Sequence, residues 1–148
     1  MTPQKQTVET DFVSGRQGNC LATCVASMLD IPVSQVPNFI ESEDMFGLLG
    51  KFLAERGYEF KGFWYYPPPD WANQFRGVDG YAIIGGPSPR PYVHAHAVIY
   101  KNGLPFFDPH PDDKFTLGIT RVYLITKKQE SSYTEKRSVS NDNLLWYL

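Results

Sequence analysis

Apolar residues recur at helical spacing directly after a short glycine-containing loop near the amino terminus. Four of them occupy positions i, i+3, i+4 and i+7 of one helix face: Leu21, Cys24, Val25 and Met28. Gly18-Asn19 precedes them and supplies loop and cap residues. Ile31-Pro32 ends the pattern, because the residue before a proline avoids the helical region. The pattern predicts a helix from about Cys20 to Asp30 with one buried face.

A second apolar stripe predicts a helix over roughly residues 44–56. Its members are Met45, Leu48, Leu49, Phe52 and Leu53. Gly57 follows the stripe and is a typical C-terminal stop. Gly47 and Gly50 within the helix cost about 1 kcal/mol each relative to alanine, so we expect close packing against another element there. Residues 34–37, between the two helices, predict a single short turn.

After Gly57 the pattern changes to the alternating, aromatic-rich runs of β-strands. Strands are expected over residues 58–66, 80–86, 93–100, 104–107 and 120–126. Asn102-Gly103 between two of these runs is a strong hairpin signal. Helices followed by an antiparallel sheet predict an α+β fold, with helices packed on the sheet. We expect one domain over residues 1–148.

The remaining segments predict an amino-terminal arm and loop over residues 1–19 and a carboxyl-terminal tail over residues 127–148. Gln6-Thr7-Val8 is expected to form a short edge strand or to lie across the surface. Residues 71–77 form a loop or helical turn, and the proline-rich residues 87–91 an irregular loop. The tail ends in five apolar residues, 144–148, which we expect to dock on the body or on a second copy.

Composition narrows the range of functions. The net charge of −2 argues against a nucleic-acid partner, because phosphate binding requires an excess of Lys and Arg. No apolar run approaches the roughly 20 residues of a membrane span, and the amino terminus has no signal-peptide stretch. We therefore expect no membrane association and a cytoplasmic location. Cys20 and Cys24 lie four apart on one helix, which is poor geometry for a disulfide, so free thiols are expected.

The two cysteines differ in their predicted roles. Cys24 falls inside the apolar stripe and has the pattern of a small core residue. Cys20 falls in the first turn of the helix, where the dipole and the unpaired backbone N–H groups favour thiolate over thiol. Cys20 is therefore a candidate nucleophile.

A second candidate group lies on the predicted hairpin. His94 and His96 are expected on one face of its first strand, and Asp108 and His110 follow its second strand. Since the second strand returns beside the first, Asp108 can reach His96. A carboxylate on one ring nitrogen fixes the tautomer and orientation of an imidazole, leaving the other nitrogen to act as a base. The residues thus predict a nucleophile, a base and an orienting group in the order Cys20, His96, Asp108.

These motifs resemble the papain-like cysteine peptidase superfamily. The similarity is to its small branch, which includes the peptidase domains of bacteriocin exporters and short thiol-hydrolase-like proteins of phages and prophages. The matching pieces are residues 18–29, residues 31–39, His96-Ala97-Val98-Ile99-Tyr100 and Asp108-Pro109. The resemblance implies a papain-like fold and a cysteine peptidase-like hydrolase with the triad Cys20, His96 and Asp108. It also implies a peptide or protein substrate, no cofactor or metal and, for a phage protein, a location in the host cytoplasm.

The chain departs from the family pattern at the oxyanion-hole glutamine. The family places this residue about six positions before the cysteine, where Ser14 stands here. Gln17 and Gln6 are the two candidates to replace it. A Gln-Thr pair precedes a variable loop in the phage-type relatives, which favours Gln6.

Two other functions and several reactions stay open at this stage. His94, His96, Asp108 and His110 have residue types that bind zinc or iron, which would make the hairpin a metal site. A catalytically inactive binding module is the other alternative, with the aromatic band of residues 63–71 as its partner surface. A thiol hydrolase in turn could act as a peptidase, isopeptidase, amidase, deamidase or acyltransferase.

Overall fold

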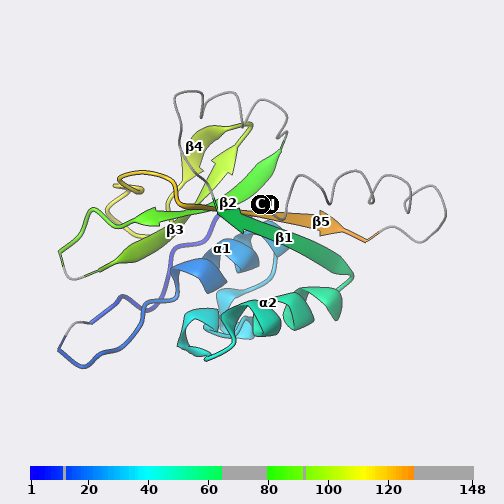
Figure 1. Cartoon of the computed structure of the whole chain (residues 1–148), viewed down its shortest axis with the longest axis horizontal. Helices are drawn as coiled ribbons and strands as arrows, with labels where there is room; N and C mark the ends of the chain where they lie inside the picture. Colours follow the sequence, from blue (N-terminus) through cyan, green and yellow to red (C-terminus); the bar gives the residue numbers. More distant parts are fainter. Residues whose placement is uncertain (12, 65–79, 92, 129–148) are drawn as a thin grey trace.

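A computed structural model describes residues 1–11, 13–64, 80–91 and 93–128, and within them an α+β fold, as predicted (Figure 1). Two α-helices come first, joined by two short 3₁₀ turns, and five strands follow. Their bounds are α1 Cys20–Leu29, η1 Val33–Gln35, η2 Phe39–Glu41, α2 Met45–Ala54, β1 Tyr58–Trp64, β2 Tyr81–Pro87, β3 Ala95–Lys101, β4 Leu104–Phe107 and β5 Arg121–Lys127.

The five strands form one antiparallel sheet in the order β1-β5-β2-β3-β4. The last strand of the described chain thus inserts between β1 and β2. Both helices lie on the same side of this sheet, α1 against β3 and β2 and α2 against β1 (Figure 1).

Both helices follow their predicted bounds within two residues, because local signals set their ends. Asp30 follows α1 in the left-handed conformation (φ 58°), which stops the helix before Pro32. Asp44 precedes α2, and its side chain accepts a hydrogen bond from the Gly47 N–H (3.0 Å). The Asp44 carboxylate occupies the space that a Cβ at Gly47 would fill, and Gly50 packs near the Phe60 ring. The expected packing against another element is confirmed at Gly50, which meets β1, whereas Gly47 makes room for the cap residue of its own helix.

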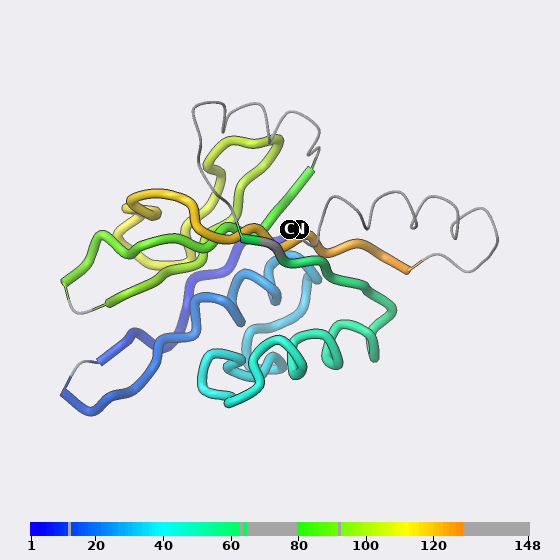
Figure 2. Tube along the Cα trace, viewed as in Figure 1, coloured from blue at the N-terminus to red at the C-terminus, as the bar shows by residue number. Residues whose placement is uncertain are grey.

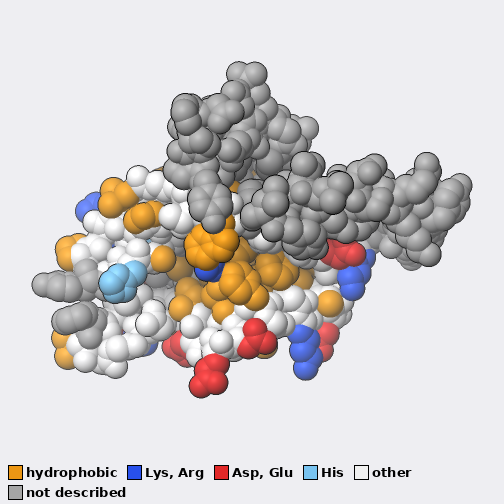
Figure 3. Space-filling model, viewed as in Figure 1, with side chains coloured by type: hydrophobic (Ala, Val, Ile, Leu, Met, Phe, Trp, Pro, Cys, Tyr) orange, Lys and Arg blue, Asp and Glu red, His pale blue; other side chains and the backbone are white. Residues whose placement is uncertain are grey.

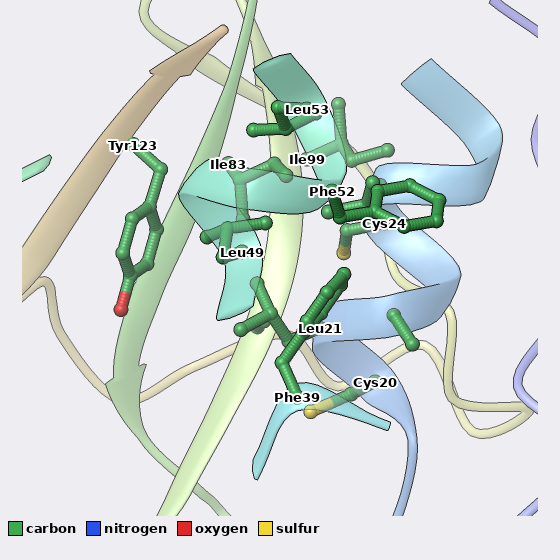
Figure 4. Packing of buried hydrophobic residues seen from close by; sticks show 13 residues of the cluster. Cys20, Leu21, Cys24, Phe39, Leu49, Phe52, Leu53, Ile83, Ile99 and Tyr123 are labelled. Carbon is green, nitrogen blue, oxygen red and sulfur yellow. The ribbon is translucent and has the colours of Figure 1, made fainter. Parts of the chain in front are cut away.

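The two faces of the sheet bury separate apolar clusters. The helix-facing cluster is drawn in Figure 4 and includes Cys20, Leu21, Cys24, Phe39, Leu49, Phe52, Leu53, Ile83, Ala97, Ile99 and Tyr123. The cluster on the opposite face is smaller, with Ala82, Ile84, Val98 and Val122 at its centre. Alternate strand residues thus supply one face each, as the period of two requires.

The predicted hairpin is present, with one difference at its start. Asn102 and Gly103 both have positive φ (51° and 82°), which is the backbone of the tight turn that Asn-Gly favours. The first strand begins at Ala95, so the prediction that His94 lies on a strand face beside His96 is wrong. The partner strand β2 ends at Pro87, which has no N–H, and one hydrogen bond from Ser88 N–H to the His94 carbonyl (3.2 Å) continues the pairing.

The amino-terminal arm forms no strand with the sheet; it lies along α1, as Figure 2 shows. Its backbone is joined to the helix by Thr2 N–H to the Ser27 carbonyl (3.0 Å) and by Asn19 N–H to the Val8 carbonyl (3.0 Å). On its other side, Gln6 N–H donates to the Pro109 carbonyl (2.8 Å). The arm therefore ties α1 to the segment that follows β4.

Several expectations fall on residues outside the described ones. These are residues 65–66 at the end of the first predicted strand, the loop at 71–77, most of the aromatic band 63–71 and the tail from residue 129 onward. Within the described part of the chain, no single helix is long and apolar enough to cross a membrane; Cys20–Leu29 and Val33–Glu41 meet such a length and composition only jointly, across a bend of 107°.

The arm leads to a stability prediction at Asn19. Its side-chain oxygen accepts from the N–H groups of Thr7 (3.2 Å) and Val8 (3.0 Å), and its amide donates to the Thr7 hydroxyl (2.9 Å). Asn19→Ala leaves these groups without partners, so we expect a loss of about 1–3 kcal/mol in the free energy of unfolding, measured by urea denaturation. The exposed Gln35→Ala is the control and should change it by less than about 0.5 kcal/mol. An unchanged stability in Asn19→Ala would show that the arm does not hold the helix.

Candidate active site

Cys20, His96 and Asp108 come together from three separate elements. Cys20 is the first residue of α1, His96 the second residue of β3, and Asp108 follows the last residue of β4. His96 Nε2 lies 2.6 Å from Asp108 Oδ1. Cys20 lies close enough to the same imidazole to raise the pKa of His96. Since Nε2 is occupied by Asp108, Nδ1 is the ring nitrogen left for the sulfur.

The surroundings of His96 favour its protonated form. The ring is almost fully buried, with 4% of its side-chain surface exposed. Burial alone would lower the pKa of His96, but the hydrogen bonds to Asp108 and Cys20 and the charges of both residues outweigh burial and raise the pKa from 6.5 to about 9. At neutral pH the site therefore holds an imidazolium between a sulfur and a carboxylate.

Asp108 is a fully buried carboxylate whose oxygens are all engaged. Oδ1 accepts from the His110 N–H (2.9 Å) besides His96, and Oδ2 accepts from the Phe115 N–H (2.7 Å). Burial alone would raise the pKa of Asp108, but the bond from His96 and these two backbone N–H groups hold the pKa below its usual 3.8. The ionised carboxylate can thus orient His96 without taking up its proton.

Arg90 supports Asp108 and was not predicted from the sequence. Its guanidinium lies 3.5 Å from Asp108 Oδ2 and makes two hydrogen bonds to the carboxylate of Asp112 (2.8 and 2.5 Å). It comes from the loop between β2 and β3 and is largely buried. A single arginine in a proline-rich loop has no sequence pattern that marks it, because its partners lie about twenty residues further along the chain.

The other two histidines lie outside the Cys20–His96–Asp108 group. His94 is exposed, and His110 Nε2 pairs with Glu9 Oε1 (2.7 Å) while its Nδ1 accepts from the Asp112 N–H (3.1 Å). No three His, Cys, Asp or Glu side chains in the described part of the chain are arranged to hold a metal ion. The metal-site alternative therefore has no geometric support among these residues.

Of the two glutamine candidates, Gln6 is half-buried and Gln17 is exposed. Gln6 Nε2 donates to the Val8 carbonyl (2.9 Å), which also accepts the N–H of Asn19, the residue before Cys20. Asp11 and Arg16 pair across the loop of residues 9–18, so Gln6 and Asn19 both reach the Val8 carbonyl despite their separation in the sequence. The Gln6 Oε1 is buried without a hydrogen-bond partner in the described structure, which leaves one end of the amide uncommitted.

Cys24 has the structural role expected of it. Figure 4 places it among Leu21, Phe52 and Ile99, with Cys20 at the margin of the cluster. Cys24 is fully buried, and this burial, together with the charges of Cys20 and Asp108, raises the pKa of its thiol well above the usual value. Both thiols are free, so Cys24 is a neutral core residue and Cys20 is the cysteine positioned for chemistry.

The raised pKa of His96 predicts how stability depends on pH. A group whose pKa is higher in the folded state than in the unfolded state stabilises the fold below its unfolded pKa, and this contribution is lost as pH rises through its folded pKa. We therefore expect roughly 3 kcal/mol of stability to disappear as pH increases from about 6.5 to about 9. Urea denaturation across this range should show a smaller decrease in His96→Gln, and the wild-type decrease in the control His94→Gln. An equal decrease in His96→Gln would contradict the assignment.

Comparison of the chain with protein families, curated proteins and solved structures finds no match in any of the three. One fold can carry several functions, so activity has to be inferred from the site itself. Here the site consists of Cys20, the neighbouring His96 and the buried Asp108 bonded to His96.

Proposed function

We propose that the protein is a thiol hydrolase of the papain-like type, which cleaves an amide, ester or isopeptide bond of a peptide or protein through an acyl-enzyme. One observation carries the proposal: a cysteine at a helix start, an imidazole and a carboxylate meet in that order from three distant parts of the chain. This arrangement matches the roles of nucleophile, base and orienting group in acyl transfer.

In the proposed acylation step, the Cys20 thiolate attacks the carbonyl carbon and forms a C–S bond. The carbonyl oxygen becomes an oxyanion, and the His96 imidazolium transfers its proton to the leaving nitrogen or oxygen as the old bond breaks. In deacylation, neutral His96 takes a proton from water, and the resulting hydroxide attacks the thioester. Release of the carboxylic acid product restores the thiolate–imidazolium pair.

Two donors are proposed for the oxyanion. One is the backbone N–H of Cys20, since the Asn19 side chain bonds to the arm and makes no capping hydrogen bond to α1. The other is the side-chain amide of Gln6, which lies next to Asn19 through their shared acceptor at Val8. Donors of this kind stabilise the charge that develops on oxygen during attack.

A binding module without catalysis is the second candidate, and the low exposure of Cys20 favours it. Only 6% of the residue's surface is accessible, so a substrate has to reach the sulfur through a narrow approach or after a local movement. The reactivity of Cys20 distinguishes the two functions, because a binding module does not require an activated sulfur.

The first test of the proposed function is alkylation by iodoacetamide at about pH 6, where an ordinary thiol is almost fully protonated. We expect stoichiometric labelling of Cys20, at least about tenfold faster than that of glutathione, detected by intact-protein mass spectrometry. Cys20→Ala should abolish the labelling, whereas the matched variant Cys24→Ala should retain it. Labelling of wild type no faster than that of glutathione would favour the binding module.

The second test distinguishes the two glutamines. Hydrolysis of 4-nitrophenyl acetate supplies the readout, because its tetrahedral intermediate needs the same oxyanion donors. We expect Gln6→Ala to lower the acylation rate by about 10- to 1000-fold and Gln17→Ala, at an exposed residue, by less than about twofold. The opposite order would assign the oxyanion hole to Gln17, and no effect in either variant would exclude both.

A further inference from the structure

A second polar group, outside the catalytic residues, lies at the start of β5. The guanidinium carbon of Arg121 is 3.9 Å from the Trp64 ring centroid and 5.0 Å from that of Phe46. Arg121 Nη1 also donates to the Tyr123 hydroxyl (3.3 Å). Both flanking rings face solvent, with Trp64 52% and Phe46 42% exposed. The aromatic side chains thus hold an arginine in one orientation at the surface.

The charge of Arg121 is not neutralised within the described part of the chain. No carboxylate there forms an ion pair with it, in contrast to Arg90, which contacts both Asp108 and Asp112. With one N–H bonded to Tyr123, other donors of the planar guanidinium are left for a ligand. A planar, oriented guanidinium fits a carboxylate through two parallel hydrogen bonds.

The sheet register places the backbone of Arg121 near that of Ala97, the residue after His96. Arg121 pairs with Gly85 on β2, and Gly85 pairs in turn with Ala97, the neighbour of His96. Two strand spacings separate the backbones of Arg121 and Ala97, a distance of about 10 Å. Residues paired directly across strands share a face, so Arg121 lies on the face where Ala97 packs in one cluster with Cys20.

Gly85 on β2 lies between Arg121 and the backbone of β3 and adds no side chain of its own there; the edge of the Tyr123 ring lies 3.9 Å from the place of its missing Cβ. A Cβ at Gly85 would lie 3.6 Å from the Arg121 Cβ and 4.0 Å from the His96 carbonyl oxygen. The glycine thus bridges the two groups with backbone alone. Figure 3 shows hydrophobic side chains gathered over β1 and the beginning of α2, with a Lys or Arg side chain among them.

We infer that Arg121, between Trp64 and Phe46, is a substrate-recognition residue that binds a carboxylate of the substrate. This inference rests on the proposed function and adds the substrate class: an acidic peptide or protein segment. Because the distance of about 10 Å between the Arg121 and Ala97 backbones spans about three residues of an extended chain, probes with the carboxylate up to four residues from the reactive bond test the site. The flanking rings favour an apolar or aromatic residue next to it.

An acidic side chain and the carboxyl terminus of a chain both present a carboxylate to Arg121. Matched irreversible probes distinguish the two. The first set consists of acetylated tetrapeptide vinyl sulfones that carry Glu or Gln at the second, third or fourth residue from the warhead. The second set has the electrophile inside the peptide, followed by three residues that end in a free carboxylate or a carboxamide. The rate constant for labelling Cys20, measured by mass spectrometry, is the readout for each matched pair.

We expect one carboxylate probe to label wild type at least about tenfold faster than its neutral partner, as loss of a charge-assisted hydrogen bond predicts. The difference should disappear in Arg121→Gln and reverse in Arg121→Glu, while Arg121→Lys should keep only part of it. The control is Lys101→Gln, which removes another cation stacked on two aromatic rings, Tyr81 and Phe106, from the opposite end of the sheet. Lys101→Gln should prefer the carboxylate probe over its neutral partner to the same extent as wild type.

The outcomes separate this inference from the proposed function. A Glu preference in the first probe set assigns the site to an acidic side chain, and a preference in the second set assigns it to a chain terminus. Equal rates for every matched pair, with rapid labelling of Cys20 by iodoacetamide, would overturn the carboxylate site and leave the hydrolase intact. A preference that persists in Arg121→Gln would overturn it as well. Failure of all probes and of iodoacetamide would overturn both.

Discussion

The interaction between the buried Asp108 carboxylate and His96 is the constraint on which the site depends. A carboxylate with no exposed surface is stable only when its charge is compensated, and Asp108 receives hydrogen bonds from His96 and two backbone N–H groups, with Arg90 nearby. The same bond fixes which imidazole nitrogen faces Cys20. Burial of the charge and orientation of the base are therefore one structural feature, and both depend on where the chain turns after β4.

The amino-terminal arm connects this constraint to the nucleophile. Gln6 is bonded to the segment after Asp108, and Val8 to the residue before Cys20, so a few arm residues link the two halves of the site. Lys5 adds to this link, since its ammonium group donates to the carbonyl oxygens of Asp108 and His110 and pairs with Asp113.

Features set by neighbouring residues in the chain could be predicted from the sequence. The apolar stripes predicted both helices, Asn102-Gly103 predicted the hairpin, and the hairpin predicted that Asp108 lies near His96. Features set by distant contacts could not be predicted. The insertion of β5 between β1 and β2, the two carboxylates beside Arg90 and the aromatic rings around Arg121 all join residues far apart in the chain. The sequence prediction placed His94 inside β3, which begins at Ala95. The alternation of apolar residues does not show that the partner strand β2 ends at Pro87.

The central claim is that a sulfur and a carboxylate together keep the His96 ring protonated. The most direct measurement is an NMR titration of the His96 ring nitrogens in the wild type and in Cys20→Ala. The account predicts a pKa of about 9 in the wild type, and a value closer to 6.5 once the hydrogen bond and charge of Cys20 are removed. A His96 that titrates near 6.5 in both proteins would contradict it, because the hydrogen bonds and charges of the two partners would then not outweigh burial.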